Sequence, residues 1–69
     1  MKIIVNGKEK KIELENEKAL LSSTLKSLGY SPNTIVVEVN DLIINSTKWE
    51  NKILKEGDRL ETVSIVGGG

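Results

Sequence analysis

The sequence predicts an α+β domain in which one principal helix packs on one face of a mixed sheet of four or five strands. Three observations support this architecture. Short segments rich in Ile and Val alternate with turn residues, one segment alone carries leucines at helical spacing, and the chain has 69 residues. That length suits one compact domain and is too short for two. A single helix with one apolar stripe needs a sheet to cover that stripe.

The chain begins with a predicted β-hairpin. Residues 1–5 are mostly apolar and residues 8–14 follow as a return strand. Between them stands Asn6-Gly7, the strongest short signal for a two-residue type I′ turn, because both of its central residues require positive φ. We therefore expect two antiparallel strands joined by a tight turn.

The principal helix is predicted from a leucine stripe. Leu21, Leu25 and Leu28 recur at i, i+4 and i+7, which places them on one helical face. Asn16 is suited to the N-cap position, and Gly29 to the position just past the helix end.

Three further strands are predicted in the second half of the chain. They occupy residues 35–40, 42–44 and 59–66, and Asn40-Asp41 forms the turn between the first two. Thr47 and Glu50 have the spacing of a capping box, which predicts one helical turn around Trp49. In a chain without Phe, Trp49 is expected to pack over one edge of the core.

The composition excludes several classes of function. Ten basic and ten acidic residues cancel, and Tyr30 and Trp49 are the sole aromatic residues, so nucleic-acid binding is not expected. The absence of Cys and His excludes disulfides, thiolate nucleophiles and the commonest general base. Asp41 and Asp58 stand in turn signals, where lone carboxylates form turns rather than metal sites. The sequence predicts neither a catalytic residue nor a metal ligand, and hence a carrier rather than an enzyme.

The expected location is the cytoplasm. No apolar run approaches the ~20 residues that cross a bilayer, so no membrane association is expected. Met1 leads directly into a strand-like segment without the layout of a signal peptide. The free chain is expected to be a monomer.

The most informative motif is the terminal run Val66-Gly67-Gly68-Gly69, which directly follows a strand. Glycines have no side chain to pack and lose much backbone entropy on ordering, so residues 66–69 are predicted to be a flexible tail on a single domain of residues 1–69. Extended, these four residues reach about 13 Å. We expect Val66, Gly67 and Gly68 to thread a partner's channel and deliver the Gly69 carboxylate for modification.

Two apolar residues of the last strand form a candidate docking surface. If Leu60 faces the helix, strand alternation places Val63 and Ile65 on the opposite face. An apolar pair beside a flexible tail suits contact with an activating enzyme.

Several segments of the sequence form a recognisable set: Ile4-Val5-Asn6-Gly7, residues 21–29, Val37-Glu38-Val39-Asn40, Glu56-Gly57-Asp58 and residues 61–69. The most specific features are the short chain and the Val-Gly-Gly-Gly ending. In these segments, and over its whole length, the sequence resembles the thiamine-biosynthesis sulfur carriers, the ThiS family. It departs from that family at Thr62 and Ser64, where apolar or aromatic residues are frequent.

The resemblance implies a ubiquitin-like β-grasp fold and a function as a protein co-substrate. It implies that an E1-like adenylyltransferase of the ThiF type uses ATP and Mg²⁺ to adenylate Gly69, while the carrier itself binds no cofactor. A sulfur donor such as a cysteine desulfurase then converts this end to a thiocarboxylate. Thiazole synthase of the ThiG type finally takes the sulfur for the thiazole of thiamine.

Two alternatives remain open from the sequence. A carrier of the same fold could serve molybdopterin synthesis or another thiolation route, with a different final acceptor. The chain could instead be a ubiquitin-like modifier or a plain interaction module. A modifier would be found linked to lysines of other proteins, and a plain module would function without Gly68 and Gly69.

Overall fold

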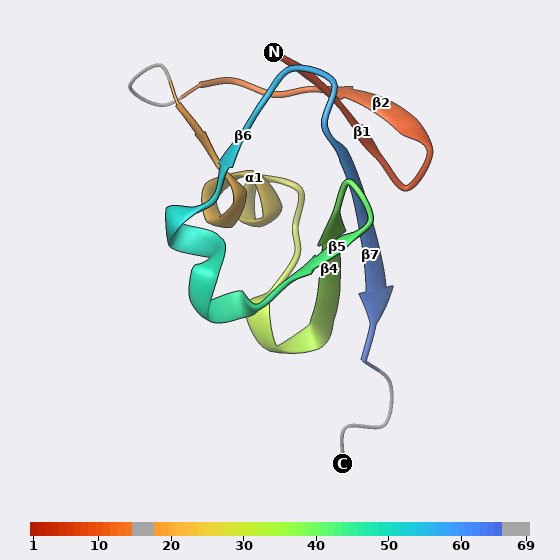
Figure 1. Ribbon diagram of the computed structural model, residues 1–69, viewed down its shortest axis with the longest axis vertical. Helices are drawn as coiled ribbons and strands as arrows, with labels where there is room; N and C mark the ends of the chain where they lie inside the picture. Colours follow the sequence, from red (N-terminus) through yellow and green to blue (C-terminus); the bar gives the residue numbers. More distant parts are fainter. Residues whose placement is uncertain (15–17, 66–69) are drawn as a thin grey trace.

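The structure is a computed structural model that describes residues 1–14 and 18–65 (Figure 1). It consists of short strands, one α-helix and two 3₁₀ segments, Pro32–Thr34 and Ser46–Asn51. The strands and helix are β1 (Lys2–Val5), β2 (Lys8–Lys11), β3 (Ala19–Leu20), α1 (Leu21–Ser27), β4 (Ile35–Val39), β5 (Leu42–Ile44), β6 (Ile53–Leu54) and β7 (Arg59–Ser64).

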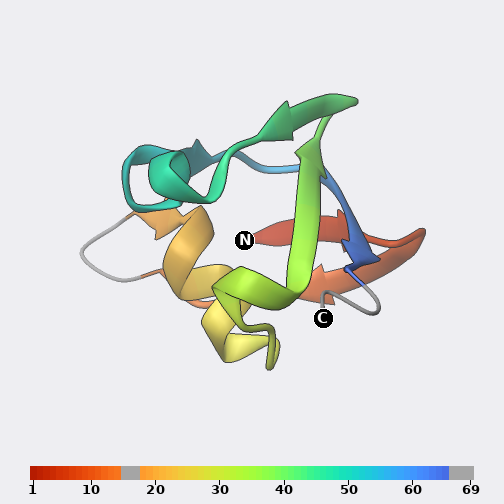
Figure 2. The same ribbon diagram turned by 90° about the horizontal axis from the view of Figure 1, so that it is seen from below.

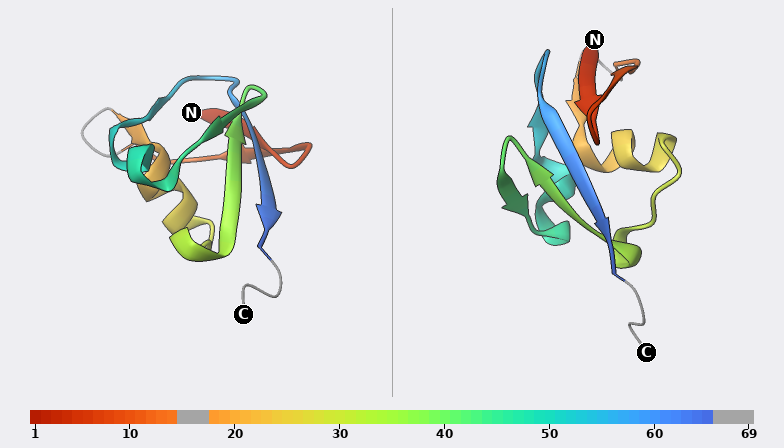
Figure 3. Two further views of the ribbon diagram at one scale, coloured as in Figure 1. Left: turned by 60° about the horizontal axis from the view of Figure 1, so that its bottom comes forward. Right: turned by 90° about the vertical axis from the view of Figure 1, so that its right-hand side faces the viewer.

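The predicted architecture is confirmed. Five strands form one mixed sheet in the order β2-β1-β7-β4-β5, in which β1 and β7 are parallel and the other neighbours antiparallel. Helix α1 covers one face of this sheet, and the opposite face carries no helix in the described part of the chain (Figures 2 and 3). The first and last strands of the chain therefore lie side by side at the centre of the sheet.

Two tight turns form where the sequence places Asn with Gly or Asp. Asn6 and Gly7 have φ values of 50° and 82°, and Val5 pairs with Lys8 across them. Asn40 adopts a φ of 50° in the second turn. Both turns have positive φ at their central residues, as expected for hairpins whose twist matches that of their strands.

Helix α1 begins later than the sequence suggests. Leu20 occupies its N-cap position without a side-chain hydrogen bond, whereas the predicted cap, Asn16, lies outside the described residues. The segment before the helix is instead a strand, because Ala19 pairs with Leu54 in a separate two-stranded sheet of β3 and β6. The N–H of Leu21 donates to the Lys52 carbonyl at 2.8 Å, so a distant segment supplies an acceptor that no local cap provides.

The helix ends as predicted. Gly29 has a φ of 92°, and its N–H donates to the Lys26 carbonyl at 3.0 Å. The N–H of Tyr30 donates to the Leu25 carbonyl at 2.9 Å. These two bonds form a Schellman motif, which satisfies carbonyls at the end of the helix and turns the chain toward β4.

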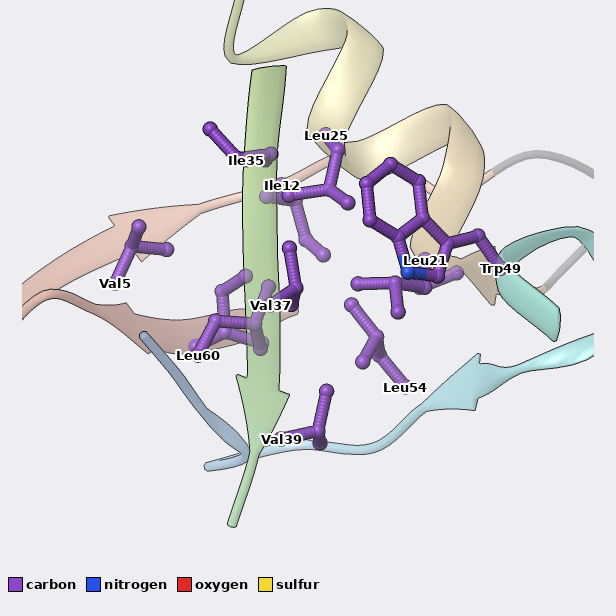
Figure 4. Packing of buried hydrophobic residues seen from close by; sticks show 12 residues of the cluster. Val5, Ile12, Leu21, Leu25, Ile35, Val37, Val39, Trp49, Leu54 and Leu60 are labelled. Atoms are coloured by element: carbon purple, nitrogen blue, oxygen red, sulfur yellow. The ribbon is translucent and has the colours of Figure 1, made fainter. Parts of the chain in front are cut away.

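One hydrophobic core lies between the helix and the sheet (Figure 4). Its members come from the strands, the helix and the second 3₁₀ segment, with Ile12 just after β2. They are Ile3, Val5, Ile12, Ala19, Leu21, Leu25, Ile35, Val37, Val39, Trp49, Leu54 and Leu60.

Trp49 packs in this core, as predicted. It is 3% exposed, and its indole N–H donates to the Ile44 carbonyl at 2.9 Å. A helical turn does surround it, but Asn45 and not Thr47 is the cap, because the Asn45 side chain accepts a hydrogen bond from the Thr47 N–H at 3.3 Å. Asn and Ser or Thr both favour this position, and the turn begins two residues earlier than the capping-box spacing indicates.

Two predicted strands are shorter in the structure. The second ends at Lys11 rather than at residue 14, and the last ends at Ser64 rather than at residue 66. Strand assignment requires a partner, and Lys11 and Ser64 pair with Lys2 and Ile35, the first residues of the antiparallel strands β1 and β4.

Candidate functional site: the end of the last strand

The candidate site is the point where β7 leaves the sheet. Ser64 pairs with Ile35 of β4, and the N–H of Ile65 donates to the Thr34 carbonyl at 2.8 Å. The main chain is therefore hydrogen-bonded up to the last described residue. The free end of β7 points away from the body of the domain (Figure 1).

A side chain from the first hairpin holds the other side of β7. The side-chain oxygen of Asn6 accepts a hydrogen bond from the Thr62 N–H at 2.8 Å, and its amide donates to the Thr62 hydroxyl at 2.9 Å. The Asn6 amide also lies 3.5 Å from the Tyr30 hydroxyl. These contacts continue the link between the hairpin and β7 beyond the point where β1 ends, because the β1–β7 pairing stops at Val5 and Leu60.

Three apolar residues form a patch beside the strand end, on the sheet face opposite the helix. We call Val36, Val63 and Ile65 the outer patch. Leu60 is fully buried against the helix side, so alternation directs Val63 and Ile65 outward. Val63 is 59% exposed, Ile65 50% and Val36 38%, and Val36 pairs directly with Val63 across the sheet. A hollow of about 530 Å³ borders Ile65 and Val36.

Two carboxylates occupy the same face, farther from the strand end. Glu38 of β4 pairs directly with Glu61 of β7. Within residues 1–14 and 18–65, neither forms an ion pair. Like charges directly opposite each other destabilise a sheet, so this pair lowers the stability of the domain.

The remaining carboxylates of interest have turn-forming roles. Asp58 accepts hydrogen bonds from the Lys55 N–H at 2.9 Å and from the Asn40 side-chain amide at 3.0 Å. Asp41 pairs with Arg59 at 3.0 Å. The part of the chain that the structure describes contains no group of three or more His, Cys, Asp or Glu suited to a metal ion. In that same part, no helix has the length and apolarity needed to cross a membrane.

The structure brings together part of the predicted site. Val63 and Ile65 are both exposed, as strand alternation predicted, whereas Val66, Gly67, Gly68 and Gly69 lie outside the described residues. The sequence alone does not indicate that Val36 and Asn6 are neighbours of this site. Val36 is a neighbour because β4 pairs with β7, which is distant in the sequence. Asn6 is recognisable from the sequence as a turn residue, but its hydrogen bonds to Thr62 are not.

Comparison with known proteins gives a consistent assignment. The ThiS family model matches residues 3–69. The crystal structure of the thiamine biosynthesis protein ThiS from Geobacter metallireducens superposes with a TM-score of 0.82 at 26% identity, covering all of both chains. A solution structure of a thiamine biosynthesis protein from the same organism gives a TM-score of 0.76 and covers all of this chain and 88% of the other.

Sequence relatives include longer proteins. A thiazole synthase of Magnetococcus marinus is 32% identical over all 69 residues, and this chain spans 20% of its length. A thiazole synthase of Paramagnetospirillum magneticum is 29% identical over the same span, again 20% of its length. The uncharacterised protein ycf40 of Trieres chinensis is 35% identical over 49 residues, 71% of this chain and 67% of that protein. The chain has the ubiquitin-like β-grasp fold and belongs to the ThiS family.

Proposed function

We propose that this chain is a sulfur carrier in thiamine biosynthesis, and that the carboxylate of Gly69 carries the sulfur. The observation that carries the proposal is the extent of the family match, which runs from residue 3 through Gly69. The glycine run is therefore part of the likeness rather than an unrelated appendage. We also propose that Gly69 is the last residue of the mature chain, because the reacting group is a free main-chain carboxylate.

The geometry of β7 supports delivery of this carboxylate. The strand is hydrogen-bonded on one side through Ile65 to Thr34 and on the other through Thr62 to Asn6. Four further residues give a reach of about 13 Å from that anchored root. A fixed root combined with a slender arm lets an enzyme position the reacting carbon accurately.

The chemistry must come from a partner, because the chain has no Cys or His. An E1-like adenylyltransferase with ATP and Mg²⁺ joins the Gly69 carboxylate to AMP and releases pyrophosphate. The terminal persulfide sulfur of a donor such as a cysteine desulfurase then displaces AMP, so that a C–S bond replaces a C–O bond and an acyl disulfide forms. A second thiol, as the two-electron reductant, attacks the donor's sulfur of that disulfide, which releases the thiocarboxylate and leaves the donor and this thiol joined as a disulfide. In this scheme the chain is a co-substrate, and Val66, Gly67 and Gly68 form the arm inside the partner's channel.

The thiazole synthase relatives favour thiamine over other sulfur pathways. In those proteins, a segment similar to this whole chain is part of one polypeptide that is named for thiazole synthesis. Joining a carrier domain and a synthase domain in one chain raises the local concentration of each at the other, which is useful when the two domains react with each other. We therefore propose a thiazole synthase as the acceptor of the sulfur, and Val63 and Ile65 as residues that dock the carrier.

Intact-mass spectrometry tests the proposal. Incubation with the adenylyltransferase, ATP and Mg²⁺, a sulfur donor and a thiol reductant is expected to add about 16 Da, the exchange of oxygen for sulfur, at the C-terminus. The control is a chain that lacks Gly68 and Gly69, which should gain nothing. An unchanged mass of the full chain, with an adenylyltransferase that modifies its own established carrier, would remove the sulfur-carrier function.

The acceptor is tested separately. Thiocarboxylated chain labelled with ³⁵S should lose its label to the thiazole product when thiazole synthase and its other substrates are added. The label could instead stay on the chain in that assay and pass to a pterin substrate when a molybdopterin-synthase large subunit is added. That result would assign the chain to the other pathway.

A further inference from the structure

Strand β7 directs its main-chain groups alternately toward β1 and toward β4. On the β1 side, the Leu60 carbonyl accepts a hydrogen bond from the Asn6 N–H at 2.8 Å, and the Thr62 N–H donates to the Asn6 side chain at 2.8 Å. On the β4 side, the Ile65 N–H donates to the Thr34 carbonyl. Even-numbered residues of β7 therefore face β1, and odd-numbered residues face β4.

The β1 side of β7 is open beyond Thr62. The chain leaves β1 at the Asn6-Gly7 turn, and Figures 1 and 3 show β7 continuing past the β1–β2 hairpin. By the alternation above, the carbonyl of Thr62 and both main-chain groups of Ser64 point to this side. Among the described residues, no strand pairs with them there. The Asn6 side chain marks the point where internal pairing stops.

This open edge differs from the other two edges of the sheet. Strand β2 exposes four consecutive charged residues, Lys8–Lys11. Strand β5 has only three residues and lies beside Lys48 and Lys52. Charged side chains and short length are the usual devices that prevent pairing with another chain. Residues 62–65 have neither a charge nor a proline, so the last part of β7 lacks the protection found elsewhere.

The position of this edge indicates what covers it. Only residues 66–69 lie between Ile65 and the proposed reactive carboxylate, a reach of about 13 Å. An enzyme that binds the carboxylate must therefore bring its surface close to Ser64. What that surface meets there is a row of main-chain donors and acceptors at strand spacing, whose natural complement is another extended main chain.

We propose that an extended segment of the adenylating enzyme pairs with β7 along residues 62–64, adding a strand between the hairpin and the tail. The added strand donates to the Thr62 carbonyl and accepts from the Ser64 N–H. This pairing rests on the proposed function, and it adds to that function the main-chain contacts by which the enzyme binds the end of β7. It needs no particular side chain at Ser64, since the contacts are main-chain bonds.

Amide hydrogen exchange of the unmodified protein is the first test. In the free chain, Ile65 should exchange slowly because it is bonded to Thr34, and Ser64 should exchange rapidly. On adding the adenylating enzyme, Ser64 exchange should slow at least about tenfold. An unchanged Ser64 rate in a complex that still adenylates the chain would overturn strand addition, while the sulfur-carrier function would stand.

A proline substitution is the second test. Ser64→Pro removes the N–H on the open side and keeps the β4 side intact, so the Kd for the enzyme should rise about fivefold to tenfold. Glu9→Pro is the matched control. Glu9 lies on the outer edge of β2, and its N–H points to solvent because Val5 and Lys8 are the hydrogen-bonded pair beside the turn. The Kd of the Glu9→Pro chain for the enzyme should stay within about twofold of the wild-type value.

The outcomes separate the two proposals. A folded Ser64→Pro chain that binds as tightly as the wild type overturns strand addition. If Ser64→Pro does not fold, the exchange measurement on the wild-type chain decides the matter alone. Failure of the wild-type chain to gain mass with an active enzyme overturns the proposed function itself, whatever the exchange of Ser64.

Discussion

Asn6 and Thr62, which are 56 positions apart in the sequence, are joined by two hydrogen bonds: the Asn6 side-chain oxygen accepts from the Thr62 N–H at 2.8 Å, and its amide donates to the Thr62 hydroxyl at 2.9 Å. The same residue adopts a φ of 50° in the first turn. One asparagine thus closes the first hairpin and holds the last strand beside it. That strand carries the tail, so the contact links the start of the chain to its proposed working end.

Replacing Asn6 should loosen this link. Asn6→Gly keeps a residue that tolerates positive φ and removes both side-chain bonds, so it should lower the free energy of unfolding by about 1–2 kcal/mol. Thr62→Val keeps the N–H donor and removes only the hydroxyl, and should cost about 0.5–1 kcal/mol. Urea denaturation measures both values. Equal stability of Asn6→Gly and the wild type would show that these bonds contribute nothing.

The indole N–H of Trp49 should contribute separately from its ring. Trp49→Phe leaves the Ile44 carbonyl without its donor but retains an aromatic side chain, and should cost about 1–3 kcal/mol. Trp49→Ala also opens a cavity in the core and should cost about 3–5 kcal/mol. Thermal and urea unfolding followed by circular dichroism provide the comparison. A Phe variant as unstable as the Ala variant would contradict this division.

The outer patch should affect partner binding without affecting folding. The double variant Val63→Ala/Ile65→Ala should change the free energy of unfolding by no more than about 0.5 kcal/mol per site, because both side chains are exposed. Its rate of adenylation by the E1-like enzyme should nevertheless fall, since apolar contact area is lost at the root of the tail.

Leu42→Ala is the matched control for this prediction, because Leu42 is 68% exposed and lies on the edge strand β5, which is separated from β7 by β4. It should adenylate like the wild type. Leu60→Ala is the contrasting variant, in which folding should be affected. Leu60 is fully buried, so its replacement should lower the free energy of unfolding by about 2–5 kcal/mol. Equal adenylation rates for the double variant and the wild type would remove Val63 and Ile65 from the docking surface.

Relieving the Glu38–Glu61 pair should stabilise the domain. Glu61→Lys places an opposite charge across from Glu38 and should raise the free energy of unfolding by about 0.2–1 kcal/mol at low ionic strength. The gain should shrink as salt increases, because exposed charges are screened. Urea denaturation in low and high salt measures it, with Glu61→Gln as the variant that removes repulsion without adding attraction. A gain that is independent of salt would assign the effect to something other than charge.

Local signals in the sequence were sufficient for the turns and for the end of the helix. Asn6-Gly7 and Gly29 adopt positive φ because few other residues do so without strain, and that preference acts within a few residues. The burial of Leu21 and Leu25 likewise follows from helical spacing alone. The α+β class followed from these elements together, since one apolar helical stripe requires a sheet.

Where the helix begins could not be read from local signals. Asn16 has the chemistry of a cap, but Ala19–Leu20 pairs with Ile53–Leu54 and the helix starts only at Leu21. The competing interaction is this strand pairing, and its partner lies more than thirty positions away in the sequence. A pattern within a few residues of Asn16 therefore cannot indicate it. Short apolar segments such as these fit a strand or a helix equally well until a partner is present.

By itself, the sequence determined which residues turn, which face of each strand is apolar, and that a glycine tail follows the last strand. Only the tertiary structure decided that β7 lies between β1 and β4, that Val36 joins Val63 in the outer patch, and that the β1 side of Ser64 has no internal partner among the described residues. The reason is physical. Alternation and turn preference act between neighbours in the chain, whereas strand order and register arise from pairing between segments that are far apart in it.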